Sequence, residues 1–204
     1  MGVLAISGAG LYGVGADPSI LGAEGLTAFP VFGDFESIAT VTLATSAASI
    51  TFSDIPQGYK HLQLRMLIRT NFNWPSSVPV FVNFNGETGN VNLSKHIIYG
   101  NGSSIGAYGS GNDRGFGGTA RLGTLANVYS AVIVDILDYS STEKFTTMRG
   151  ITGEDENGAT TGVVQIDSNC WRSTAAVSSI LITPFGSGAN FVQHNTAALY
   201  GIRG

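Results

Sequence analysis

The sequence is short of cysteine, of charge and of long apolar runs. Its single cysteine, Cys170, excludes an intrachain disulfide and with it the disulfide-stapled secreted scaffolds. There are 10 Lys and Arg against 14 Asp and Glu, a net charge of -4 with no basic cluster, so nucleic acid is not expected as a partner. No uninterrupted apolar stretch reaches the ~18 residues of a transmembrane helix, so membrane insertion is not expected either.

Hydroxyl side chains and glycine take the place of charge. The 204 residues include 28 Gly, 20 Ser and 18 Thr, whereas charged residues make up 12%, half the usual share of about 25%. So little charge is typical of an all-β protein whose surface is largely occupied by neighbouring subunits, because free-standing cytosolic enzymes need surface charge for solubility. The length corresponds to one domain that can bury a full core.

Residues 1–35 differ from the rest of the chain. They contain no Lys or Arg, and eight of them are glycine. The segment lacks the positive start of a signal peptide, and it is too apolar for a solvated linker. We therefore expect an irregular, glycine-rich anchoring arm over residues 1–35, followed by one domain over residues 36–204.

From residue 36 onward the pattern is that of short strands. In Lys60–Thr70 the apolar residues Leu62, Leu64, Met66 and Ile68 alternate with the others, which is the period of a strand with one buried face. Since amphipathic helices are missing, we predict an all-β fold, an antiparallel β-sandwich of jelly-roll type. Similar Val, Ile, Thr and Phe content recurs at 36–44, 48–54, 78–84, 131–139, 144–152, 160–168, 177–185 and 197–204.

Glycine content also suggests two special segments. The glycine-rich stretch Tyr99–Gly118 is expected to be a long exposed loop or a flap. The glycines at 8, 10 and 13 match the fingerprint of dinucleotide-binding folds. That fingerprint needs a helix directly after it, which Gly15 and Pro18 would break, so we interpret the match as chance.

No cofactor, metal site or catalytic site is expected. The three histidines are far apart, Cys170 has no cysteine partner, and no nucleophile motif is present. The acidic run at 154–157 lacks the spacing of a calcium loop and is interpreted as a solvated turn. Asp135 and Asp138 are interpreted as a hydrogen-bonded pair that caps the following turn, in preference to a catalytic dyad.

Aromatic residues beside polar ones in expected loops offer candidates for ligand binding. Trp74, Tyr108, Asp113 and Arg114 have the composition of a sugar-binding surface, where rings stack on the sugar and short polar groups bond its hydroxyls. The alternative is that these rings pack under their own loops or at a subunit contact.

Several longer stretches carry a family resemblance. They are ASITFSDIPQGYKHLQLRMLIRT, VNFNGETG, IIYGNGSS, AVIVDILDYSSTEKFTTMRGITG and the terminal AALYGIRG. In this order they resemble a family of β-rich virion proteins of tailed bacteriophages, over about residues 36–204. The resemblance implies a tail, fibre or capsid-associated structural protein and brings no catalytic residues. Residues 1–35 lie outside it.

These observations predict a structural subunit of a phage particle, a tail or fibre component or a head decoration protein, and not an enzyme. Its arm is expected to dock on other virion proteins, and apolar surface left by the low charge predicts a homo-oligomer, with a homotrimer favoured. The expected location is the virion, assembled in the cytoplasm of the bacterial host. The alternative function is a carbohydrate-binding adhesin that recognises a glycan on the host surface. A glycan depolymerase is disfavoured because no carboxylate pair stands out.

Overall fold

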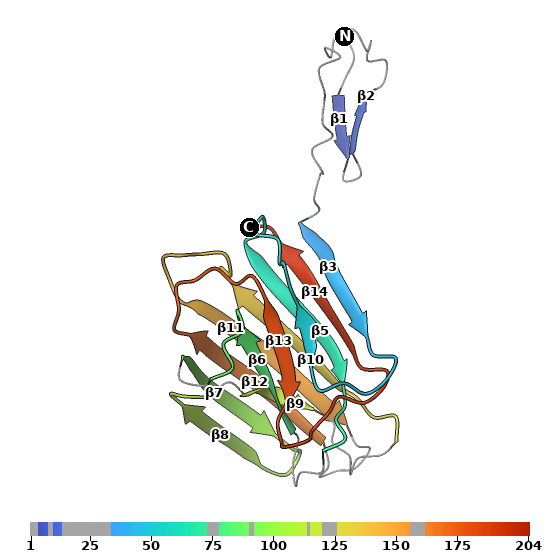
Figure 1. The fold of residues 1–204 in the computed structure, drawn as a ribbon, viewed down its shortest axis with the longest axis vertical. Helices are drawn as coiled ribbons and strands as arrows, with labels where there is room; N and C mark the ends of the chain where they lie inside the picture. Colours follow the sequence, from blue (N-terminus) through green and yellow to red (C-terminus); the bar gives the residue numbers. More distant parts are fainter. Residues whose placement is uncertain are drawn as a thin grey trace.

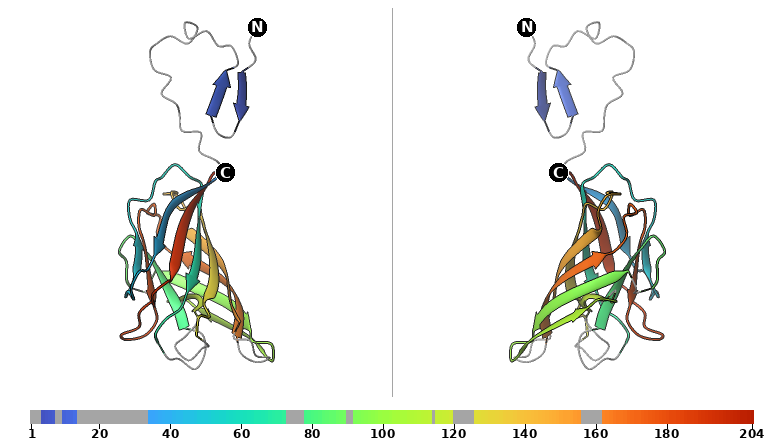
Figure 2. Two further views of the ribbon diagram at one scale, coloured as in Figure 1. Left: turned by 90° about the vertical axis from the view of Figure 1, so that its right-hand side faces the viewer. Right: turned by 90° about the vertical axis from the view of Figure 1, so that its left-hand side faces the viewer.

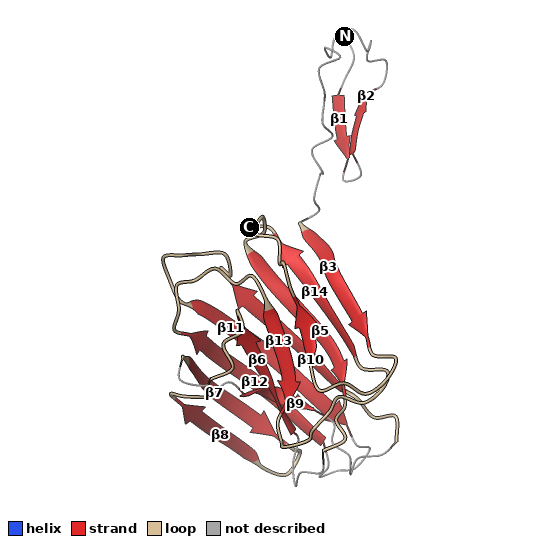
Figure 3. Ribbon diagram, in the orientation of Figure 1, coloured by secondary structure: helices blue, strands red, loops and turns tan. Residues whose placement is uncertain are grey.

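The computed structural model describes residues 4–7, 10–13, 34–72, 78–89, 92–113, 115–119, 126–155 and 162–204. These residues form strands, turns and loops, with no helix among them (Figure 3). None of the described residues therefore belongs to a helix that could cross a membrane. The all-β class predicted from the sequence is confirmed.

Two antiparallel sheets form the body, one of eight strands and one of four. The larger has the order β3-β14-β5-β10-β11-β12-β7-β8 (Figure 1), and the smaller has the order β4-β13-β6-β9. The larger comprises β3 (Phe35–Thr42), β14 (Thr196–Ile202), β5 (His61–Ile68), β10 (Ser130–Leu137), β11 (Thr146–Asp155), β12 (Gly162–Trp171), β7 (Leu93–Gly100) and β8 (Ile105–Ser110). The smaller comprises β4 (Ile50–Phe52), β13 (Ile180–Pro184), β6 (Val78–Phe84) and β9 (Gly115–Thr119).

The chain passes back and forth between the two sheets, which lie face to face (Figure 2). β3, β5, β10 and β14 belong to the larger sheet, and β4, β6, β9 and β13 to the smaller one. Two consecutive pairs, β7 with β8 and β11 with β12, are the exceptions, because both members of each pair join the larger sheet. They extend that sheet beyond β10 by four strands.

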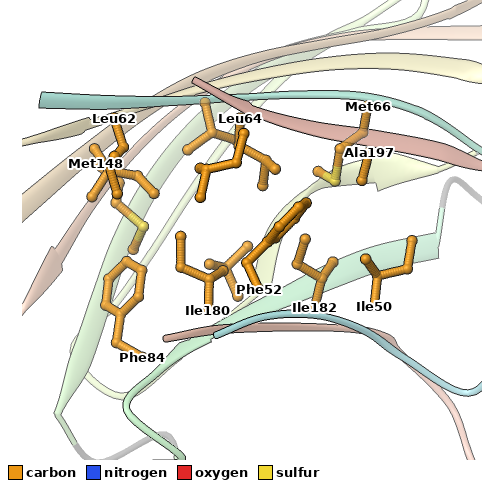
Figure 4. Close-up of a cluster of buried hydrophobic side chains, with 14 of the residues drawn as sticks. Ile50, Phe52, Leu62, Leu64, Met66, Phe84, Met148, Ile180, Ile182 and Ala197 are labelled. Atoms are coloured by element: carbon orange, nitrogen blue, oxygen red, sulfur yellow. The ribbon is translucent and has the colours of Figure 1, made fainter. Parts of the chain in front are cut away.

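The core lies between the sheets, where alternating apolar side chains from both meet (Figure 4). On β5 the side chains of Leu62, Leu64, Met66 and Ile68 are all buried, as the alternation predicted. They face apolar residues of the smaller sheet, among them Phe52, Phe84, Ile180 and Ile182. Because successive side chains of a strand point to opposite faces, the other residues of β5 lie on the outer face of the sheet.

The prediction of a loop or flap over Tyr99–Gly118 is wrong. This stretch contains the end of β7, all of β8 and most of β9. Its glycines serve close packing: a Cβ added at Gly106 would lie 2.4 Å from the Tyr99 ring, and one at Gly109 would lie 2.7 Å from the His96 ring. Glycine is tolerated in these strands because a neighbouring ring occupies the space of the missing side chain.

Within residues 1–35 the structure describes two short strands and the final two residues. β1 (Leu4–Ser7) pairs antiparallel with β2 (Gly10–Gly13). Gly10 to Gly13 are therefore extended, whereas a dinucleotide fingerprint would begin a helix there. The remainder of the expected arm lies outside the described residues, and its anchoring role stays a prediction. β3 begins at Phe35, one residue before the predicted domain boundary.

Candidate functional site

Two of the four sugar-binding candidates meet at a lysine that sequence reasoning missed. Lys95 on β7 places its Nζ 3.1 Å from Oδ2 of Asp113 and 5.5 Å from the centre of the Tyr108 ring. Lys95 is 7% exposed, whereas Tyr108 is 50% exposed. Trp74 and Arg114 lie outside the described residues.

Pairing of β7 with β8 builds this Lys95 cluster, which we define as Lys95, Tyr108 and Asp113. Tyr108 stands opposite Ile97, so its ring lies diagonally beside the lysine two residues earlier. The backbone N–H of Asp113 donates to the carbonyl of Leu93, 2.9 Å away, and fixes the chain after β8. No sequence signal marked Lys95, because β7 was not among the predicted strands and the stretch that contains Tyr108 and Asp113 was expected to be a loop.

Beside the Lys95 cluster, the inward side of β12 is polar. Gln165, Asp167 and Asn169 are all buried and alternate with exposed Val164, Ile166 and Ser168. Nε2 of Gln165 donates to Oδ1 of Asp167 at 2.8 Å. In this strand the usual arrangement is inverted, because the polar residues point inward and the apolar ones point to solvent.

Glu154 and Asp155 belong to β11, so the described half of the acidic run at 154–157 is strand and not the solvated turn that was predicted. Glu154, the last residue but one of β11, faces inward, is 7% exposed, and accepts a hydrogen bond from Oγ of Ser130 at 3.2 Å. Glu156 and Asn157 lie outside the described residues. Among the described residues, no three His, Cys, Asp or Glu side chains gather at a position where they could hold a metal ion.

The outer face of the larger sheet, the one turned away from the smaller sheet, carries an apolar strip. Pairing places Ile133, Ile151, Ile166 and Ile98 directly beside one another across β10, β11, β12 and β7. These four side chains are 43–59% exposed. We call these four isoleucines the ridge. The exposed side chains of the next row, two residues along the strands, are Leu67, Val164 and Ile105. We call the ridge and this row together the outer strip.

A shallow groove of about 310 Å³ borders the ridge on the same face. Its floor includes the small side chains Ala131, Ala198 and Thr196, between Leu67 and Tyr200. At its far side the Arg65 guanidinium lies 5.1 Å from the centre of the Phe35 ring and 5.3 Å from that of Tyr200. The two rings stack with centres 4.8 Å apart.

A polar row runs parallel to the ridge, one residue pair further along the strands. It joins Gln63, Asp135, Arg149, Ser168 and His96 on β5, β10, β11, β12 and β7. Nε2 of Gln63 donates to Oδ1 of Asp135 at 2.7 Å. The row thus carries both signs of charge beside an uncharged strip.

The predicted pairing of Asp135 with Asp138 is wrong, because the two carboxylates have different partners. Asp135 accepts from Gln63, while Asp138, in the turn after β10, binds Nζ of Lys60 at 3.1 Å and also the ammonium of Lys144. Hydrogen bonds from Lys144 and then Lys60 lower the pKa of Asp138. Asp138 does organise the turn, but through lysines.

Two tyrosines next to this turn have raised pKa values. Burial raises the pKa of Tyr139, whose hydroxyl donates to the carbonyl of Pro56. Partial burial, together with a 2.7 Å hydrogen bond to Glu36, raises the pKa of Tyr59 to about 12. Both tyrosines stay protonated at neutral pH and act as hydrogen-bond donors that fasten the ends of strands.

Comparisons with protein-family models, with curated proteins and with solved structures find no match for this chain. The functional conclusions therefore depend on its own residues and geometry.

Proposed function

We propose that this chain is a structural, non-catalytic subunit of a tailed-phage virion, either a tail or fibre component or a head decoration protein. The observation that carries the proposal is the outer strip. Monomeric proteins rarely expose a contiguous apolar patch of this extent without using it for contacts. The inverted polarity of β12 supports the same conclusion. In a protein without partners, we would expect the apolar Val164 and Ile166 to face the core.

We infer further that the fold is a jelly roll, an architecture of viral capsid and lectin domains. Support comes from the strand order with β7, β8, β11 and β12 set aside. When the remaining eight strands are numbered 1 to 8 along the chain, the strand order is 1-8-3-6 in the larger sheet and 2-7-4-5 in the smaller one. A jelly roll, which consists of eight strands in two Greek keys, has this strand order.

In this proposal residues 1–35 dock on neighbouring virion proteins while residues 36–204 face outward. The copies form a homotrimer, and the protein is located in the virion after assembly in the host cytoplasm. The low charge supports dense packing of copies, because 24 charged residues in 204 give little mutual repulsion.

Labelling of particles tests the virion role. An antibody raised against residues 34–204 would be applied to intact virus particles released from cells that carry this gene, and bound gold particles would be located by electron microscopy. We expect regular labelling of a head or of a tail. Particles that carry no label, while the protein is abundant in the lysed cells, would overturn the proposal.

The Lys95 cluster favours glycan binding as a second candidate function. A half-exposed ring beside a lysine and a carboxylate combines a stacking surface with groups that bond hydroxyls. Tyr108→Ala should abolish binding on a glycan array, whereas Ile105→Ala, on the same strand, should leave it unchanged. An array without a bound glycan for the unaltered protein would remove this candidate.

A further inference from the structure

The outer strip has a shape that can be matched by another part of the same face. The ridge projects from β10, β11, β12 and β7, while the groove, floored by small side chains, lies over β14, β5 and β10. The ridge residue on β12 and the groove centre on β5 are three strands apart, or about 14 Å at a strand spacing of about 4.8 Å. The ridge of one chain therefore cannot fill its own groove.

Charge on this face is compatible with a second copy. The outer strip itself carries no charged side chain, Arg65 lines the groove, and the polar row carries Asp135 and Arg149 on neighbouring strands. Copies facing each other can therefore set a carboxylate against a guanidinium. This face offers no extended surface of one sign of charge that would complement a strongly charged partner.

The size of the face also fits a contact between proteins. Six strands, from β5 to β8, at about 4.8 Å spacing and with a length of eight residues at about 3.3 Å each, cover roughly 29 by 26 Å, or about 750 Å². Standard interfaces bury about 800 Å² on each partner. Contact with a further copy can thus cover the strip without additional surface.

We propose that the outer strip is the contact between copies of this chain, with the ridge of one copy packed into the groove of the next. The inference rests on the proposed assembly role and specifies its partner.

The first test is the mass in solution of the full chain and of two matched variants. Light scattering at micromolar concentration should give an oligomer for the unaltered protein and a monomer for Ile166→Arg, at the centre of the ridge. Phe145→Arg, which replaces a similarly exposed side chain outside the outer strip, should leave the oligomer intact. Circular dichroism and thermal unfolding would confirm that both variants are folded.

The second test is a cross-link that only two copies can form. Leu67 and Val164 lie in the same row but three strands apart, which is too far for a disulfide within one chain. In a Cys170→Ser background, a mixture of Leu67→Cys and Val164→Cys proteins should form a covalent dimer under mild oxidation, in higher yield than either protein alone.

The outcomes separate this contact from the virion role. An unaltered protein that stays monomeric, or an Ile166→Arg variant that remains oligomeric, would overturn the contact even if particles are labelled. An oligomer of two chains that Ile166→Arg dissociates would support the contact and overturn the trimer. If the oligomer behaves as expected but particles carry no label, the contact stands and the virion role fails.

Discussion

The turn after β10 depends on a few polar side chains with defined protonation. Asp138 adopts a φ of 51°, and its carboxylate joins Lys60 to Lys144. Tyr139, fully buried, donates to Pro56 and ties this turn to the segment before β5. At the neighbouring strand ends, Tyr59 packs its ring on Gly201 and donates to Glu36. Apart from the bond between Asp138 and Lys144, these bonds join segments distant in sequence.

The raised pKa of Tyr59 predicts a loss of stability in alkali. Because the folded state favours the protonated phenol, its contribution is complete below the unfolded pKa of about 10 and is lost as the pH rises toward about 12. Urea unfolding measures the free energy of unfolding at pH 8 and pH 11. The loss of this free energy between the two pH values should be smaller for Tyr59→Phe than for the unaltered chain. The same difference in both proteins would contradict this assignment, and Tyr139 accounts for what remains in the variant.

The buried face of β5 predicts unequal costs at adjacent residues. Leu64→Ala removes a fully buried side chain between the sheets and should lower the free energy of unfolding by about 2–5 kcal/mol. Gln63→Ala, on the outer face, loses only partly exposed hydrogen bonds and should cost about 1 kcal/mol or less. Chemical denaturation of both variants measures the two costs, and similar small values would mean that the strand register is wrong.

Whole strands are held in register partly by side chains that imitate a neighbouring strand. Just after β5 ends, the Asn195 amide spans the Arg69 backbone: its Oδ1 accepts from the Arg69 N–H at 2.9 Å and its Nδ2 donates to the Arg69 carbonyl at 2.8 Å. Asn195 is fully buried and lies directly before β14. This amide continues the pairing of β5 with β14 where the ladder stops.

Asn195→Ala should therefore destabilise the fold more than a matched change nearby. The substitution leaves the partly buried Arg69 N–H without the Asn195 acceptor, which costs about 1–3 kcal/mol. Asn190→Ala is the control, because its side chain makes only a 3.3 Å bond to the neighbouring Gly188 carbonyl. Urea denaturation compares the two, and an equal effect would show that the Asn195 amide is not needed at the strand end.

At the scale of the whole molecule, the arm and the body are predicted to be separable. The backbone N–H of Arg203 donates to the Asp34 carbonyl, and Phe35 begins β3, so the shortest complete body starts at residue 34. A chain lacking residues 1–33 should fold with an unchanged unfolding midpoint but should fail to join particles. Circular dichroism and incorporation beside the full chain measure these two properties. Equal incorporation would refute the anchoring role, and failure to fold would place the arm in the core.

The strands and one buried face follow from the sequence alone. Alternation marked β5 and its four buried side chains, because a period of two is a local property of the chain. Composition marked the other main strands for the same reason, with the exception of β7, which was not predicted. β8 and β9 escaped detection because glycine normally weakens a strand, and only the tertiary structure places the rings of Tyr99 and His96 over Gly106 and Gly109.

Which side of a strand faces the core was decided by the tertiary structure. In β12 the sequence alternates Val164 and Ile166 with Gln165 and Asp167, and alternation by itself cannot say which set is buried. Pairing of β12 between β11 and β7 turns the polar set inward and aligns the isoleucines of four strands, which lie far apart in sequence, on the outside. In the same way, the pairing of β7 with β8 brings Tyr108 to Lys95. Local periodicity thus determined the strands, whereas long-range pairing created both candidate surfaces.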